Sequence, residues 1–190
     1  MHMKNKIARQ NKDENQSQSA ASQSKRSRKK TEYGRQLEEK QKVRNMYGMR
    51  EKQFMRFFAL AKRSSIGTGD MLLSLLERRL DNVLYRLKFT TSRLQARQIV
   101  VHGHVLVNGS KVSSPSYLVD VNDEISFSPR VDKKTVFVEQ VLEKRVKTAK
   151  VPDWLELDRQ GRKGRVLRAP VRTDIQAPVE EYLIVELYSK

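Results

Sequence analysis

The chain has 190 residues and a formal net charge of +17, because 39 Lys and Arg outnumber 22 Asp and Glu. This length fits one or two domains, and so basic a protein usually binds a polyanion, either nucleic acid or an anionic membrane surface. The chain lacks cysteine, an apolar run of about 18 residues and an apolar signal core, which excludes thiolate chemistry, a transmembrane helix and a secretory signal.

Residues 1–34 are predicted to form a basic arm that becomes ordered only on RNA. They are rich in Gln, Ser, Asn, Lys and Arg and nearly free of branched apolar residues, so they offer no face for a core. The cations of the arm cluster at Lys25, Arg26, Arg28, Lys29 and Lys30. A solvated tail is the alternative, and the sequence leaves it open.

Helical periodicity follows the arm. Apolar residues spaced by three and four predict helix over residues 35–64, with a break or bend at Gly48. After a loop at residues 64–69, Asp70 is a suitable N-cap for a helix over residues 71–88, which carries one wide leucine stripe.

A further helix is predicted from Arg93 to about Val101. Ser92 and Gln95 form a capping box at its start, and Gly103 suits its C-terminal end. Because only residues 88–91 join it to the preceding helix, the two helices must meet in a tight corner.

Beyond Gly103 the apolar period changes to two. Segments 104–107 and 111–113 flank Asn108 and Gly109, a strong signal for a two-residue hairpin turn. The later predictions are short strands at 117–119 and 124–127, helix over 133–148, mostly irregular structure over 151–175, and a strand-like apolar segment at 181–188.

The helical corner carries arginines suited to RNA phosphates. Arg93 and Arg97 are four residues apart and share a helix face, while Arg79 and Arg86 are seven apart on the preceding helix. Guanidinium groups bind phosphate through paired, charge-assisted hydrogen bonds. Either Arg79 or Arg86 could instead pair with Asp81 or another acid.

These residues resemble a known RNA-binding domain. Arg79-Leu80-Asp81, the run from Ser92 to Ile99 and the run from Val105 to Gly109 are similar to the S-four domain pattern R-L-D … S-R-x-x-A-R-Q-x-I/V … G-x-V-x-V-N-G. The flanking segments 39–54, 151–158 and 181–190 look like bacterial-type small-subunit ribosomal protein S-four. The resemblance covers about residues 32–190.

The resemblance implies an α+β fold with two folded parts. A helical N-terminal domain would span 35–77 and be completed by 176–190. A small S-four RNA-binding domain of two helices and a short antiparallel sheet would span 78–140, and 141–175 would be a basic helix end and an irregular connection.

By the same resemblance, the function is structural and not enzymatic. It implies direct binding to the 5′ region of small-subunit rRNA, nucleation of assembly, contact with neighbouring ribosomal proteins and with mRNA where it enters, and an effect on decoding accuracy. We expect a cytoplasmic ribosomal protein, with an organellar ribosome left open, that has no membrane contact, cofactor or small-molecule substrate. The RNA-binding residues carried over are Arg79, Arg86, Ser92, Arg93, Gln95, Arg97, Gln98, Asn108 and Gly109, together with the arm cations.

Two other functions have to be weighed. An RNA-modifying enzyme could share the Arg-Leu-Asp signature but would need a catalytic domain, and a ribosome-associated RNA chaperone would lack the flanking segments. Many members of the resembled family hold zinc through N-terminal cysteines, so this chain resembles a zinc-less variant. His102 and His104 alone make a poor metal site, and no metal is predicted.

Overall fold

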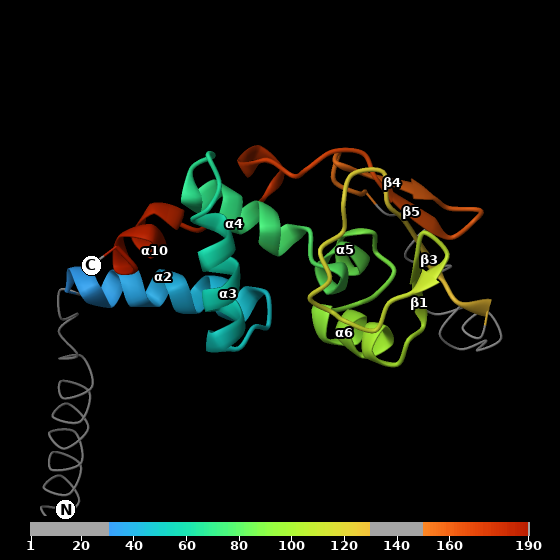
Figure 1. Cartoon of the computed structure of the whole chain (residues 1–190), viewed down its shortest axis with the longest axis horizontal. Coiled ribbons are helices and arrows are strands. Elements are labelled where there is room, and N and C mark those ends of the chain that lie inside the picture. The colour runs from blue at the N-terminus through green and yellow to red at the C-terminus, as the bar shows by residue number, and fades with distance from the viewer. Residues whose placement is uncertain (1–30, 130–149, 190) are drawn as a thin grey trace, which may run out of the picture. The chain divides into compact units, whose positions relative to one another are not determined.

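The computed structural model describes residues 31–129 and 150–189 (Figure 1). The chain divides into two units, Met1–Arg35 and Gln36–Lys190, and the fold described below lies in the second except for residues 32–35, which begin its first helix. The arm cations Lys25, Arg26, Arg28, Lys29 and Lys30 and the helix predicted over 133–148 lie outside the described residues. No described helix is long and apolar enough to cross a membrane.

Six α-helices and one 3-10 helix are described. They are α2 (Glu32–Met46), α3 (Glu51–Ala61), α4 (Thr68–Glu77), α5 (Leu80–Arg86), α6 (Arg93–Val101), η2 (Arg172–Asp174) and α10 (Glu181–Leu187). The predicted break at Gly48 is confirmed, because this glycine has a φ of +59° and separates α2 from α3. The N-cap of α4 is Gly67, so the prediction of Asp70 as the cap is wrong, and Asp70 lies in the first turn.

The single helix predicted over 71–88 is two helices, α4 and α5. The chain breaks at Arg79, whose backbone is extended (φ −63°, ψ 137°) and pairs in an isolated bridge with Leu118. The Leu80 amide donates to the Tyr117 carbonyl (2.9 Å) in place of an intrahelical partner. Segment 117–119, predicted as a strand, therefore makes only this bridge, and the bridge interrupts the leucine-rich helix.

The strands form one antiparallel sheet of five. They are β1 (Val105–Val107), β2 (Ser110–Lys111), β3 (Glu124–Phe127), β4 (Leu155–Asp158) and β5 (Lys163–Val166), in the order β2-β1-β3-β5-β4. The predicted hairpin turn is confirmed, because Asn108 and Gly109 have φ values of +50° and +77° and join β1 to β2. Positive φ at both central residues is typical of a type I′ turn.

Two predictions for the C-terminal part of the chain are wrong. Residues 155–166 form the hairpin of β4 and β5, which extends the sheet beyond β3, instead of an irregular connection. Residues 181–187 form α10 instead of a strand. A short apolar run does not distinguish a strand from a buried helical turn by its periodicity, and Leu183 and Ile184 are buried side by side on one helix.

The described residues form two hydrophobic clusters. One lies between α5, α6 and the sheet, and it includes Leu84, Leu87, Phe89, Ile125 and Trp154. The other gathers α2, α3, α4 and α10, and it includes Val43, Phe54, Phe58, Leu72 and Ile184. Figure 1 shows α5 and α6 beside the sheet and α10 beside α2 and α4. The corner between α5 and α6 is thus fixed by its packing against one face of the sheet.

Candidate nucleic-acid interface

The predicted cap of α6 is confirmed. The Ser92 side chain accepts a hydrogen bond from the Gln95 backbone amide (3.2 Å). Gln95 completes the turn differently from a capping box, since its Oε1 accepts from the Thr91 amide (2.6 Å) and hydroxyl (2.9 Å). Gly103 ends the helix with a φ of +69°. These local bonds fix the direction in which α6 leaves the corner.

Arg79 is not on the surface. Its side chain is fully buried, its Nε and Nη2 donate to the two Asp81 oxygens (3.0 and 2.6 Å), and its guanidinium lies 5.4 Å from the centre of the Phe57 ring. The alternative pairing with Asp81 is therefore what the structure contains. Since no phosphate can reach a fully buried guanidinium without unfolding the corner, Arg79 is removed from the candidate interface.

Arg86 also has a protein partner. Its Nε and Nη2 donate to the two oxygens of Glu77 (2.8 and 2.6 Å), and the Glu77 side chain is only 1% exposed. Although burial disfavours both charges, the paired hydrogen bonds and mutual attraction lower the pKa of Glu77 and raise the pKa of Arg86. Arg86 is one-fifth exposed and serves first to neutralise a buried carboxylate.

Glu77 is the centre of a buried polar network. Besides Arg86, it accepts hydrogen bonds from the Tyr47 hydroxyl (2.7 Å) and from Asn82 Nδ2 (2.8 Å). The Asn82 Oδ1 in turn accepts from Arg93 Nε (2.8 Å). We call these five residues, Tyr47, Glu77, Asn82, Arg86 and Arg93, the Glu77 network. Burial and the nearby Glu77 charge raise the pKa of Tyr47, so its hydroxyl remains a donor.

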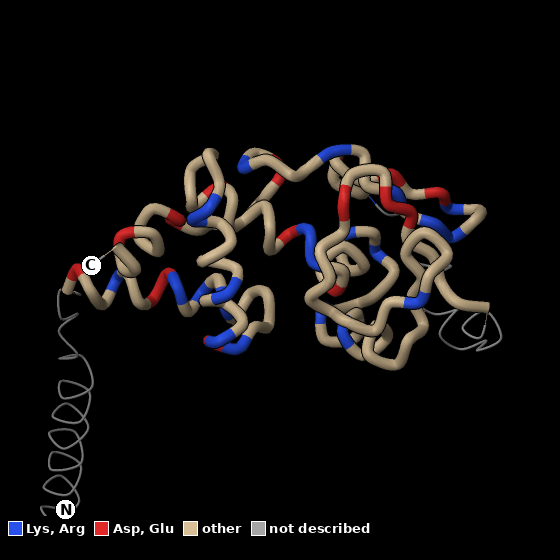
Figure 2. The backbone as a smooth tube through the Cα atoms, viewed as in Figure 1, with Lys and Arg blue, Asp and Glu red and all other residues tan. Residues whose placement is uncertain are grey.

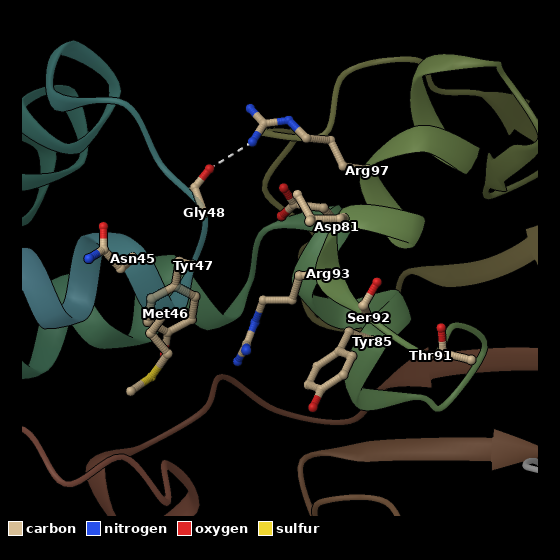
Figure 3. A pocket seen from close by; sticks show the side chains of 11 residues that line it. Asn45, Met46, Tyr47, Gly48, Asp81, Tyr85, Thr91, Ser92, Arg93 and Arg97 are labelled. Atoms are coloured by element: carbon tan, nitrogen blue, oxygen red, sulfur yellow. Dashed lines mark hydrogen bonds between the residues drawn. The ribbon is translucent and has the colours of Figure 1, made fainter.

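The predicted pair Arg93 and Arg97 lies together on α6, and both side chains reach toward the loop after α2 (Figure 3). The Arg93 guanidinium lies between two rings, 5.1 Å from the centre of Tyr47 and 4.6 Å from that of Tyr85. Arg97 Nη1 donates to the Gly48 carbonyl (2.9 Å). Each arginine thus uses one nitrogen for the fold. No partner among the described residues takes the other nitrogens.

A pocket of about 340 Å³ opens beside these two arginines. It is lined by Asn45, Met46, Tyr47, Gly48, Asp81, Tyr85, Thr91, Ser92, Arg93, Leu94 and Arg97. Figure 3 shows Arg93 extending into the space between Tyr47 and Tyr85. The one acidic side chain of the lining, Asp81, has both oxygens taken by Arg79. The pocket therefore combines cationic donors with aromatic and aliphatic walls.

The other predicted contact residues lie apart from the pocket. Gln98 is exposed on α6, and Asn108 and Gly109 form the exposed tip of the β1–β2 hairpin. The Asn108 amide is engaged, because Nδ2 donates to Asp123 (2.7 Å) and Oδ1 accepts from the Glu124 amide (2.9 Å). Asn108 thus fastens the hairpin tip to the start of β3, which leaves Gly109 as the open part of the tip.

A further group of cations was missed as a candidate site. Arg50, Lys52, Arg56, Lys62 and Arg63 are exposed on and beside α3, and Figure 2 shows the basic positions along this part of the backbone. Within the described part of the chain, none of their side chains has a hydrogen-bond or ion-pair partner. The signal was present in the sequence, since no acidic residue occurs between Glu51 and Asp70. We call these five residues the α3 cations.

Comparison with protein families agrees with this geometry. The model of the "S4 domain" matches residues 78–125, which contain α5, α6, β1, β2 and the first half of β3. The model of the "Ribosomal protein S4/S9 N-terminal domain" matches residues 1–77, which contain α2, α3 and α4. This S4 domain is the S-four domain that the motifs around Arg79, Ser92 and Asn108 resemble.

Individual proteins match over most of the chain. The small ribosomal subunit protein uS4 of Halothermothrix orenii is 52% identical over 165 residues, which cover 87% of this chain and 78% of that protein. The uS4 proteins of Aquifex aeolicus and Pelobacter propionicus are each 50% identical, covering 87% and 85% of this chain and 79% and 77% of theirs. Identity of this extent over both folded parts shows that the chain belongs to the uS4 family of small ribosomal subunit proteins.

Proposed function

We propose that the chain is a structural, non-enzymatic component of the small ribosomal subunit that binds its rRNA directly. The observation that carries the proposal is the set of α3 cations, which are exposed and unpaired within the described residues. The one acid in their stretch of sequence, Glu51, is engaged by Lys40 and Arg44. When exposed cations of a protein neutralise RNA phosphates, the counterions condensed on those phosphates are released, and this release drives binding. Family membership makes small-subunit rRNA the RNA in question.

The proposed interface extends from α3 to the corner. Arg97 bonds the carbonyl of Gly48, which lies two residues before Arg50, the first of the α3 cations. Ser92, Arg93, Gln95, Arg97, Gln98, Asn108 and Gly109 remain in the proposed interface, with the arm cations Lys25, Arg26, Arg28, Lys29 and Lys30. Arg86 is a partial contributor because of its pairing with Glu77.

The finer parts of the role are also proposals. They are binding to the 5′ region of the rRNA, nucleation of assembly, contact with neighbouring ribosomal proteins and with incoming mRNA, an effect on decoding accuracy, and a cytoplasmic location. A helical domain of 35–77 with 176–190, and an S-four domain of 78–140, remain the proposed division. The packing of Val179 and Ile184 against α3 and α4 supports the first domain.

The proposal is tested by rRNA binding at several salt concentrations. Replacing Lys52, Arg56 and Arg63 together by Ala should lower the affinity for a small-subunit rRNA transcript and reduce the slope of log K against log salt by about three. The control replaces three exposed cations of the β4–β5 hairpin, Arg159, Lys163 and Arg165, of which Lys163 already pairs with Glu124. Equal losses from both variants would reduce the assignment to general charge, and a flat salt dependence of the unmodified protein would reject the proposed function.

A further inference from the structure

The pocket beside Arg93 and Arg97 differs from the α3 cations in its chemistry. The α3 cations offer charge alone, whereas the pocket pairs two guanidinium groups with exposed apolar surface. Leu94, on the pocket lining, is 74% exposed, the most of any large hydrophobic residue described. An ionic contact with the phosphates of a duplex would gain nothing from an exposed leucine.

The arginines of the pocket are held ready for a ligand. Arg93 lies between the rings of Tyr47 and Tyr85, and its Nε donates to Asn82 (Figure 3). Its terminal nitrogens have no partner among the described residues. A guanidinium with an aromatic ring on either side has little room to stack on a base, but its terminal nitrogens still offer a fork of donors of the kind that matches phosphate. Because the fork is held in place, binding costs little further ordering.

The size and mixture of the lining point to one ligand class. We propose that this pocket receives a single unpaired nucleotide of the rRNA, with its phosphate on the open nitrogens of Arg93 and Arg97 and its base against Leu94 and Met46. A volume of about 340 Å³ is at the lower end of small-molecule pockets. A base inside a duplex would first have to be unpaired and unstacked to enter it, which costs free energy that an unpaired nucleotide does not pay. Proteins bind RNA bases mainly in loops and bulges, where bases are already unstacked. This inference rests on the proposed function.

The test removes the apolar wall without changing charge. Leu94→Ala should weaken binding of the full chain to a small-subunit rRNA transcript by about tenfold, because one base would cover the three removed carbons only in part, and their complete burial would correspond to roughly fiftyfold. The slope of log K against log salt should not change, because no cation is lost. Val101→Ala is the matched control, since Val101 is 56% exposed on the same helix and lies outside the pocket lining. It should leave binding unchanged, and circular dichroism should report the same fold for both variants.

Chemical probing of the bound transcript supplies the second measurement. With the unmodified protein, the nucleotides protected from base-specific reagents should include one that is unpaired, and Leu94→Ala should restore the reactivity of that nucleotide only. A transcript containing 4-thiouridine should crosslink under ultraviolet light to peptides that contain residues 45–48 or 91–97.

The outcomes separate this inference from the proposed function. If the unmodified protein binds but Leu94→Ala and Val101→Ala behave alike, and crosslinks fall only elsewhere, the nucleotide pocket is rejected and the proposed function stands. A protein ligand is the other outcome. In that case Leu94→Ala and Val101→Ala again behave alike in RNA binding, but in isolated subunits the pocket peptides crosslink to an acidic segment of a neighbouring protein. If the unmodified protein does not bind the transcript, both ideas fail.

Discussion

Replacing Glu77 by Gln is expected to destabilise the described fold clearly, although the change is conservative in size. The glutamine keeps the size of the side chain but removes the charge that faces Arg86, and its amide presents donors toward the Tyr47 hydroxyl and the Arg86 fork. Three groups that now donate to a carboxylate would compete for one carbonyl oxygen. The change therefore leaves buried donors without acceptors, which costs more than the net value of the bonds themselves.

The expected cost follows from burial. Removing one partner of a buried ion pair typically costs about 3–5 kcal/mol. Arg86 is 20% exposed and can turn partly toward water, so the lower end applies, about 3 kcal/mol. For a folded chain of this size, the midpoint of thermal unfolding should fall by about 6–12 °C. Urea denaturation followed by circular dichroism measures the free energy, and calorimetry measures the midpoint.

Glu51→Gln is the matched control. Glu51 also receives two cations, Lys40 (2.7 Å) and Arg44 (3.2 Å), but its side chain is 43% exposed. Solvent-exposed pairs contribute at most about 1 kcal/mol. A loss below about 1 kcal/mol for Glu77→Gln, or equal losses for the two variants, would refute the argument that burial makes the Glu77 network stabilising.

Three other outcomes follow. Since the pKa of Glu77 is lowered on folding, its contribution to the free energy of unfolding is present above its ordinary pKa of 4.5 and is lost as pH falls through the lowered value. Urea titrations below about pH 4.5 should therefore show the unmodified protein losing more stability than Glu77→Gln. Gly164→Ala should destabilise by about 1–3 kcal/mol, because a Cβ there collides with the Leu87 side chain, and a cost near zero would mean that Leu87 can repack. Replacing Arg93 and Arg97 together by Ala should lower rRNA affinity and reduce the slope of log K against log salt by about two. It should also lower the free energy of unfolding by about 1–3 kcal/mol, because Arg97 donates to the Gly48 carbonyl and Arg93 contacts the Tyr47 ring. An unchanged melting midpoint would contradict those contacts.

Local signals in the sequence predicted local structure correctly. The cap at Ser92, the helix end at Gly103 and the turn at Asn108 and Gly109 each depend on a few neighbouring residues, and all three are confirmed. The α+β class and the helical corner also follow from patterns of this length. The β4–β5 hairpin was missed because its strands are four residues long and carry charged side chains on their exposed positions.

The roles of the arginines depend on partners distant in sequence. Arg93 and Arg97 share a face as their spacing predicted, but the rings and the carbonyl that hold them belong to residues about fifty positions earlier and to α5. Arg79 is buried against Asp81 at the break between α4 and α5, where its backbone bridges to Leu118, and no spacing rule indicates this break. The α3 cations could have been predicted, because the absence of acids between Glu51 and Asp70 is visible in the sequence.

The Glu77 network also limits how this chain can diverge. Its members come from the loop after α2, from the end of α4, from α5 and from the start of α6, and each supplies a donor or acceptor that another requires. In a coupled network of this kind, the effects of single substitutions do not add. A homologue that lacks Glu77 is therefore expected to differ at Arg86 and Tyr47 as well, so these three positions should covary. The α3 cations have no such partners, and Lys and Arg should replace one another there independently.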